Sequence, residues 1–101
     1  MHKIDFQNLP WETPMPGMRS QTFTQNGSRM RMLEIDESYV EPDWCRKAHF
    51  GIVLDGLLEI DFEGRVERYQ PGEGFSIGTD DGHKGRSLVP LTRLMLVEQD
   101  I

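Results

Sequence analysis

The sequence has one cysteine, no long apolar run and few basic residues, and each shortage excludes a class of protein. Cys45 has no second cysteine with which to form an internal disulfide, so the fold does not rest on disulfides. No apolar stretch approaches the roughly 20 residues of a membrane-spanning helix. The first residues also lack the apolar segment of a secretory signal. These absences predict a soluble, cytoplasmic protein that has no membrane partner.

Acidic residues outnumber basic ones, with 17 Asp and Glu against 11 Lys and Arg, and the formal net charge is −6. A chain with this charge is repelled on average by phosphate backbones and anionic membrane surfaces. Arg29 and Arg31 form a local basic spot, as do Arg46 and Lys47. Alternation along a strand usually places such residues on a solvated face. The sequence therefore predicts no nucleic-acid partner.

Turn-forming residues divide the chain into short segments and indicate one all-β domain covering residues 1–101. The 10 glycines and 6 prolines are spread singly along the chain, as in a domain with many turns. Asn26-Gly27 is a strong hairpin signal between expected strands at residues 18–25 and 28–35. Further turn signals follow at intervals of roughly eight residues, the spacing of sandwiches and barrels: Asp55-Gly56, Glu63-Gly64 and Pro71-Gly72.

Residues 1–17 differ from the rest, because the segment from Trp11 to Gly17 contains two prolines and a glycine. This composition predicts an extended or looped N-terminal arm. The apolar residues of the arm need a surface to cover, and we expect a second subunit to provide it. The protein is therefore predicted to be a homodimer.

The β-barrel is expected to span residues 18–98. After a polar connection the chain should re-enter a strand around Cys45. Leu58, Ile60 and Phe62 alternate with acidic residues, which predicts a strand with one buried and one wet face. The last strands are predicted at residues 83–89 and 92–98.

Two stretches resemble the motifs of the cupin superfamily, small jelly-roll barrels in which two hairpins contribute to one metal site. The resemblance covers about residues 30–98 and implies a cupin-like jelly-roll β-barrel of antiparallel strands. The second motif is matched by Pro71-Gly72-Glu73, Ile77 and His83, with Gly78 and Asp80 where the family usually has proline and glycine. The first motif keeps its ending: Val53-Leu54-Asp55-Gly56.

The resemblance also implies positions for metal ligands, although only His83 matches the family in residue type. In the first motif, Asp43, Cys45 and His49 stand where two histidines and a glutamate are usual. Imidazole, thiolate and carboxylate groups together suit a divalent transition metal such as zinc, iron, nickel or manganese. Lys47 opposes this reading, because its ammonium group would repel a cation if it shared the same face.

The same interior is the predicted ligand pocket. Residues two apart on a strand share a face, so Lys47 and Val53 are expected to line the pocket together with His49. Trp44 and Phe75 are candidates for stacking on a planar ligand.

Two functions fit these residues. The first is a metal-binding enzyme of unassigned reaction that acts on a small polar molecule inside the barrel. The second is a metal-free module that binds a small ligand in the same cavity without catalysis, with Cys45 as a small buried residue. Fold alone does not choose between them.

Overall fold

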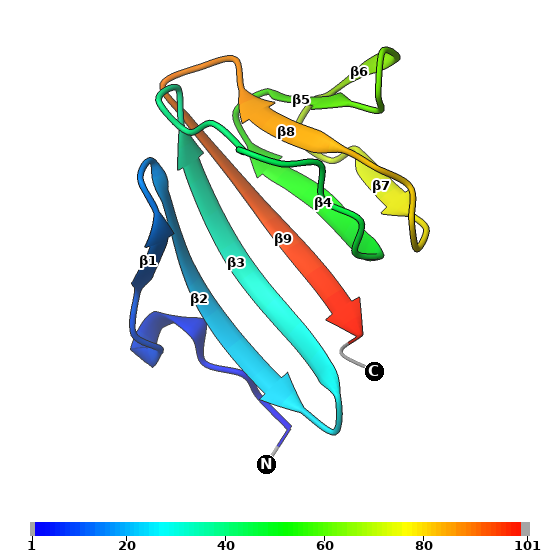
Figure 1. The fold of residues 1–101 in the computed structure, drawn as a ribbon. Helices are drawn as coiled ribbons and strands as arrows, with labels where there is room; N and C mark the ends of the chain where they lie inside the picture. The colour runs from blue at the N-terminus through cyan, green and yellow to red at the C-terminus, as the bar shows by residue number, and fades with distance from the viewer. Residues whose placement is uncertain (1, 100–101) are drawn as a thin grey trace.

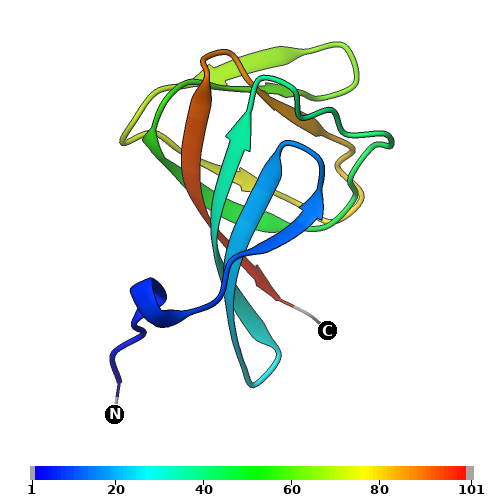
Figure 2. The same cartoon turned by 90° about the vertical axis from the view of Figure 1, so that its left-hand side faces the viewer.

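The computed structural model describes residues 2–99 and shows an all-β chain (Figure 1). Six strands form one antiparallel sheet in the order β1-β2-β3-β9-β4-β7, and three form a second in the order β6-β5-β8. Both sheets curve around a shared interior, as the turned view shows (Figure 2). Within residues 2–99, no helix has the length and apolar character needed to cross a membrane. The elements are η1 (Phe6–Asn8), β1 (Glu12–Met15), β2 (Met18–Gln25), β3 (Ser28–Asp36), β4 (His49–Asp55), β5 (Leu58–Asp61), β6 (Val66–Tyr69), β7 (Gly74–Ile77), β8 (Lys84–Ser87) and β9 (Leu91–Gln99).

The hairpin predicted around Asn26-Gly27 is confirmed, because β2 and β3 pair from Gln25 and Ser28 beside the turn to Met18 and Ile35. Asn26 has φ 50° and Gly27 has φ 78°. Two central residues with positive φ are characteristic of the type I′ turn, whose twist matches that of the flanking strands.

The strand expected around Cys45 begins later in the structure. Strand β4 starts at His49, and Cys45 lies in the connection before it, where it forms an isolated β-bridge with His83. The backbone of Cys45 pairs with His83 instead of with a strand of the large sheet, and this single bridge does not extend into a ladder.

Part of the predicted arm is regular structure. Strand β1 pairs with β2, and the side chain of Gln21 holds the preceding segment through the carbonyls of Phe6 and Leu9. The guanidinium carbon of Arg19 lies 3.9 Å from the centre of the Trp11 ring, a cation–π contact. The arm therefore packs on the sheet of its own chain, and the homodimer stays a prediction.

The two faces of the large sheet differ in character. Within residues 2–99, nine buried hydrophobic residues form the core, all of them on strands of the two sheets except Tyr39, which follows β3: Leu33, Ile35, Tyr39, Val53, Leu58, Ile60, Ile77, Leu94 and Leu96. On the opposite face of β4, alternation exposes Phe50, Ile52 and Leu54.

Strand β5 has the predicted buried face, but its other face is less exposed to solvent than expected. Leu58 and Ile60 are each 3% exposed, while Glu59 is only 7% exposed. Arg68 of β6 and Arg86 of β8 lie directly across from Glu59, and both donate to its carboxylate. Their side chains cover the acidic group that the alternation pattern assigned to solvent.

Glu34 is held in the same way on the large sheet. It accepts hydrogen bonds from Arg19 of β2 and from Arg93 of β9, its cross-strand neighbours on either side. Burial raises the pKa of Glu34, but the two arginines outweigh this effect and lower it below the usual 4.5. The ionised carboxylate therefore stabilises the fold.

We predict that Glu34→Gln lowers the free energy of unfolding near neutral pH by on the order of 1 kcal/mol, because the arginines are half exposed. In the wild type, the stability that Glu34 adds is present above pH 4.5 and is lost as the pH falls through the lowered pKa of the folded state. Urea unfolding at a series of pH values should thus show a shallower acid dependence for Glu34→Gln. The exposed Glu37→Gln is the control, and an equal effect from Glu37→Gln would contradict the prediction.

Candidate functional site

Sheet register brings charged residues into one row on the inner face of the large sheet. Arg29 of β3 lies opposite Glu98 of β9. The pairing of β9 with β4, continued by one residue beyond Phe50 and Val97, sets His49 opposite Glu98. Because side chains alternate along strands, this row points inward together with Leu94 and Leu96.

His83 and Cys45 reach the same place through the β-bridge between their segments. The backbone N–H of Cys45 donates to the carbonyl of His83 at 2.9 Å, and the N–H of His83 donates to the carbonyl of Cys45 at 3.0 Å. One residue farther along the connection, the N–H of Asp80 donates to the carbonyl of Arg46. The connection before β4 is therefore fastened to the loop before β8, beside the first residue of β4.

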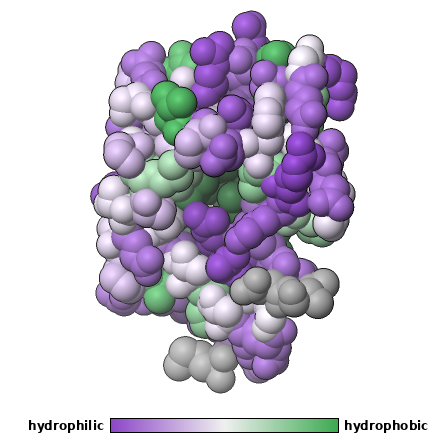
Figure 3. All heavy atoms as spheres, viewed as in Figure 1, coloured by the Kyte–Doolittle hydropathy of each residue, from purple (hydrophilic) through white to green (hydrophobic). Residues whose placement is uncertain are grey.

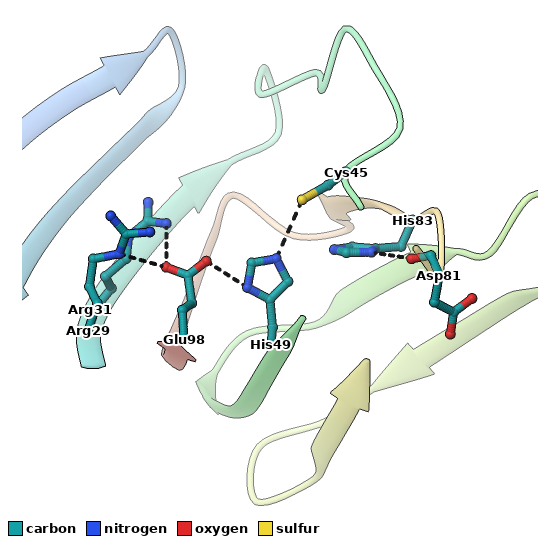
Figure 4. A network of polar contacts seen from close by, with 7 residues as sticks. All are labelled: Arg29, Arg31, Cys45, His49, Asp81, His83 and Glu98. Carbon is teal, nitrogen blue, oxygen red and sulfur yellow. Dashed lines mark hydrogen bonds and ion pairs between the residues drawn. The ribbon is translucent and has the colours of Figure 1, made fainter. Parts of the chain in front are cut away.

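Cys45, His49 and His83 form a compact group of possible metal ligands (Figure 4). Their ligand atoms all lie within 4.8 Å of one another. Sγ of Cys45 is 3.4 Å from Nε2 of His49, close to the roughly 3.5 Å that separates a sulfur and a nitrogen on one tetrahedral zinc ion. The two imidazole rings meet edge to face with their centres 5.1 Å apart.

Each histidine has an acceptor beside the ring nitrogen that faces away from this group. Nδ1 of His83 lies 2.9 Å from the carbonyl oxygen of Asp81. Nδ1 of His49 lies 2.7 Å from Oε2 of Glu98, a close polar contact although its angle is not that of a good hydrogen bond. Acceptors at Nδ1 favour the tautomer with a free lone pair on Nε2. Figure 4 shows the other nitrogen of His83 directed toward Cys45 and His49.

Glu98 is a buried carboxylate that lies behind the group of Cys45, His49 and His83. Its side chain is 3% exposed and also contacts Arg29 and Arg31, both at 3.2 Å. Burial raises the pKa of Glu98, but the contacts with His49 and Arg31 outweigh burial and bring the pKa to about 2. The carboxylate is therefore ionised near neutral pH and holds the His49 ring in place.

The group lies at one side of a cavity of about 140 Å³ between the two sheets. In Figure 3 apolar atoms line a hollow near the middle of this face of the molecule. Most of the lining is aliphatic or aromatic, and the polar lining residues are Arg31, Tyr39, Glu41, Cys45, His49 and His83. The cavity thus joins an apolar wall to a polar end.

The structure distributes the remaining predicted residues differently. Phe75 lines the cavity. Val53 is fully buried in the core and does not line it, because its side chain is enclosed by neighbouring residues. Asp43, Trp44 and Lys47 are exposed on the connection and line no part of the cavity, since this segment is not a strand with an inward face. Lys47 is solvated outside the cavity and does not share its interior with Cys45, and Asp43 is not among the grouped ligands.

Sequence reasoning missed Glu98, Glu41 and the inward role of Arg31. Arg29 and Arg31 were expected on a solvated face, but they are half-buried and contact Glu98. The alternation of Leu94, Leu96 and Glu98 was the available signal, because it places a carboxylate at an inward position that needs a partner. Glu41 lies in an irregular connection, and no periodic pattern assigns a direction to its side chain.

Two kinds of chemistry are compatible with this arrangement. A thiolate and two imidazoles are donors that zinc and related metals accept. Cys45, His49 and Glu98 also form a chain of thiol, imidazole and carboxylate. In such a chain the imidazole can act as the base that activates a cysteine nucleophile, and the carboxylate orients the imidazole. The second histidine, His83, has a place in the first arrangement and none in the second.

Comparison with known proteins identifies the architecture. No protein-family model and no curated protein matches the chain. Among solved structures, KdgF from Halomonas sp. matches with a TM-score of 0.80 and 19% identity over 94% of this chain and 91% of that one. The polyketide cyclase RemF from Streptomyces resistomycificus matches with a TM-score of 0.81 and 18% identity, over 100% of this chain and 80% of that one. An RmlC-like cupin from Shewanella frigidimarina NCIMB 400 matches with a TM-score of 0.79 and 14% identity, over 100% of this chain and 92% of that one.

The chain has the cupin fold. The predicted fold class is thereby confirmed, including the antiparallel jelly-roll arrangement of the strands. Within residues 2–99, the cupin fold consists here of two facing sheets that no ladder joins into a closed barrel. At identities below 25% the likeness establishes the fold alone, because one fold supports many activities.

Gly51 lets the ring of Phe75 lie against β4 in this cupin fold. A Cβ at Gly51 would lie 2.3 Å from Cζ of Phe75 and 2.9 Å from Cδ2 of Leu96. We predict that Gly51→Ala lowers the free energy of unfolding by about 1–3 kcal/mol, because the ring must move into the cavity. Urea unfolding measures the loss. Gly78→Ala is the matched control, since no heavy atom lies within 4 Å of a Cβ there, and equal losses would refute the role of Gly51.

Proposed function

We propose that Cys45, His49 and His83 hold one divalent transition metal ion, and that the protein acts on a small molecule that reaches the ion through the cavity. The observation that carries this proposal is the acceptor behind each histidine. Metal-bound histidines usually donate their outer N–H to a carboxylate or a carbonyl. Glu98 and Asp81 supply one of each.

The donor set supports zinc first among the expected metals. Thiolate and imidazole are the usual donors of zinc sites, whereas manganese prefers oxygen donors. Three protein ligands leave a fourth position for water or substrate, and a bound ion supplies Lewis-acid polarisation or a water of lowered pKa. The roles of the chain are then separate: Cys45, His49 and His83 bind, and Glu98 orients His49.

Charge around the group is compatible with a cation. Arg31 lines the cavity and would repel an ion on its own, but its guanidinium contacts Glu98, whose carboxylate also meets Arg29 and His49. Adding a thiolate at Cys45 would bring a further negative charge to the group. A bound divalent ion would offset that charge, because metal binding favours deprotonated ligands.

The structural neighbours include enzymes and leave the reaction open. RemF is described as a polyketide cyclase, so an enzyme acting on an organic molecule has this architecture. With 18% identity, the likeness is consistent with an enzyme here and assigns no reaction.

A metal-free binding module is the second candidate. The mostly apolar lining of the cavity favours it, because a pocket of this composition can hold a small ligand without a metal. Under this reading, Cys45 is a half-buried thiol beside two histidines that line the pocket.

Metal content tests the proposal directly. We predict that chelator-stripped wild-type protein binds about one zinc ion per chain, measured by elemental analysis and by competition with a chromogenic chelator. His83→Ala and Cys45→Ser should each weaken binding at least tenfold, while the exposed His2→Ala should not. If neither the wild type nor His83→Ala takes up zinc, iron, nickel or manganese, the metal-free module replaces this proposal.

The orienting role of Glu98 has a matched control within the same sheet. Glu98→Gln should weaken zinc binding by about 10–100-fold, because it replaces the carboxylate beside Nδ1 of His49. Glu34→Gln removes a carboxylate of equal burial that also contacts two arginines but touches no proposed ligand. Equal zinc affinities of the two variants would show that Glu98 has only a structural role.

A further inference from the structure

We infer that the cavity takes a compact, mostly apolar molecule with a single hydrogen-bonding group, and that this group faces Glu41. The inference deepens the proposed function by naming a ligand class for the same cavity, and it rests on that proposal for the choice of cavity and for the assignment of Cys45, His49 and His83 to the metal. It differs from the sequence-based expectation of a polar molecule.

The size of the cavity sets the size of the ligand. The cavity volume is about 140 Å³, and an apolar cavity of about 150 Å³ accommodates a molecule the size of benzene. The ligand body is therefore about one six-membered ring or an equivalent branched chain.

The walls set its polarity. Both sheets contribute aliphatic side chains to the lining, including Leu33, Ile35, Leu58, Ile60, Leu94 and Leu96. These side chains offer no hydrogen bond to a ligand. A sugar or another polyol would lose several hydrogen bonds to water on entering, and each unpaired buried hydroxyl costs free energy.

Most polar groups at the end of the cavity are already engaged. Arg31 and His49 contact Glu98, and Nδ1 of His83 contacts the carbonyl of Asp81. The inward atoms of the two histidines and of Cys45 belong to the proposed metal centre. The groups left to pair with a ligand are Glu41, the hydroxyl of Tyr39 and the N–H groups of Arg31 that do not contact Glu98. This small set favours a ligand with a single hydrogen-bonding group.

Glu41, with the hydroxyl of Tyr39 close to it, is placed to meet a ligand. It lines the cavity and is half-buried, and Oε1 accepts a hydrogen bond of 2.8 Å from the N–H of Gly85. Burial raises the pKa of Glu41, although the N–H of Gly85 and the nearby histidines oppose the effect. Burial also raises the pKa of Tyr39, with Glu41 adding to the rise, so that its hydroxyl stays protonated. The Gly85 contact fixes one carboxyl oxygen and orients the group beside the apolar wall.

The closing experiment adds phenol, benzene or glucose to the chelator-stripped full chain. Binding of each probe is measured from changes in the amide chemical shifts in NMR spectra. We expect phenol and benzene to bind with shifts at residues around the cavity, and glucose not to bind. Tighter binding of glucose than of phenol would overturn the inference, as would phenol shifts confined to the outer face of β4.

Variants locate the probe and its polar group. Leu33→Phe fills part of the cavity and should weaken the binding of both phenol and benzene. Glu41→Gln should weaken phenol binding about fivefold, because an amide replaces the carboxyl group that faces the ligand, and should leave benzene binding unchanged. Asp43→Asn, on the exposed part of the same connection, should change neither. If Glu41→Gln and Asp43→Asn bind phenol equally well, the role of Glu41 is wrong.

Zinc titration of the same samples separates this inference from the proposed function. Phenol binding without zinc binding would support the ligand class and refute the metal centre. Zinc binding without phenol or benzene binding would support the metal centre and refute the ligand class. Should Leu33→Phe fail to fold, Ile77→Phe, in β7 on another part of the cavity wall, replaces it.

Discussion

The candidate site depends on one buried carboxylate, that of Glu98. An ionised group in the interior costs several kcal/mol unless charged partners surround it. Here Arg29, Arg31 and His49 surround Glu98 from the two neighbouring strands. These contacts join β3, β9 and β4 through one group, and they also determine which nitrogen of His49 faces the cavity. The same contacts therefore stabilise the sheet and orient a functional side chain.

Carboxylates between arginines recur in this small domain. Glu34 contacts arginines of β2 and β9, and Glu59 contacts arginines of β6 and β8. The arginine side chains at Glu34 and Glu59 are 49–67% exposed, whereas those at Glu98 are 21–25% exposed. The difference in burial, and the presence of a histidine, distinguish the Glu98 group from the structural pairs, because interactions between charges strengthen as water is removed.

The cavity depends on complementary shapes as much as on charge. Gly51 leaves room for the Phe75 ring at the wall, and the β-bridge between Cys45 and His83 brings the two ligand-bearing segments together. A side chain at Gly51 would push the ring inward, and loss of the bridge would free the segment that carries Cys45. The apolar wall and the polar end thus come from separate parts of the chain.

Much of the fold was predictable, because turn chemistry and alternation act over short distances. Asn26-Gly27 predicts the β2–β3 hairpin, and the spacing from Pro71 to His83 indicates the cupin fold. The convergence of His49 with His83 also follows from that resemblance. The direction of Lys47 was not predictable, since it depends on where β4 begins, and the hydrogen bonds that end a strand involve distant partners.

By itself, the sequence determined the class of fold, the hairpin turns and two of the histidines worth examining. Local backbone preferences and residue periodicity are contained in a few neighbouring residues, so they can be recognised without a partner segment. Only the tertiary structure decided that Cys45 joins those histidines while Asp43 does not, and that Glu98 and Glu41 belong beside them. These placements depend on sheet register and on a single long-range bridge, and such contacts between distant residues leave no periodic signal in the chain.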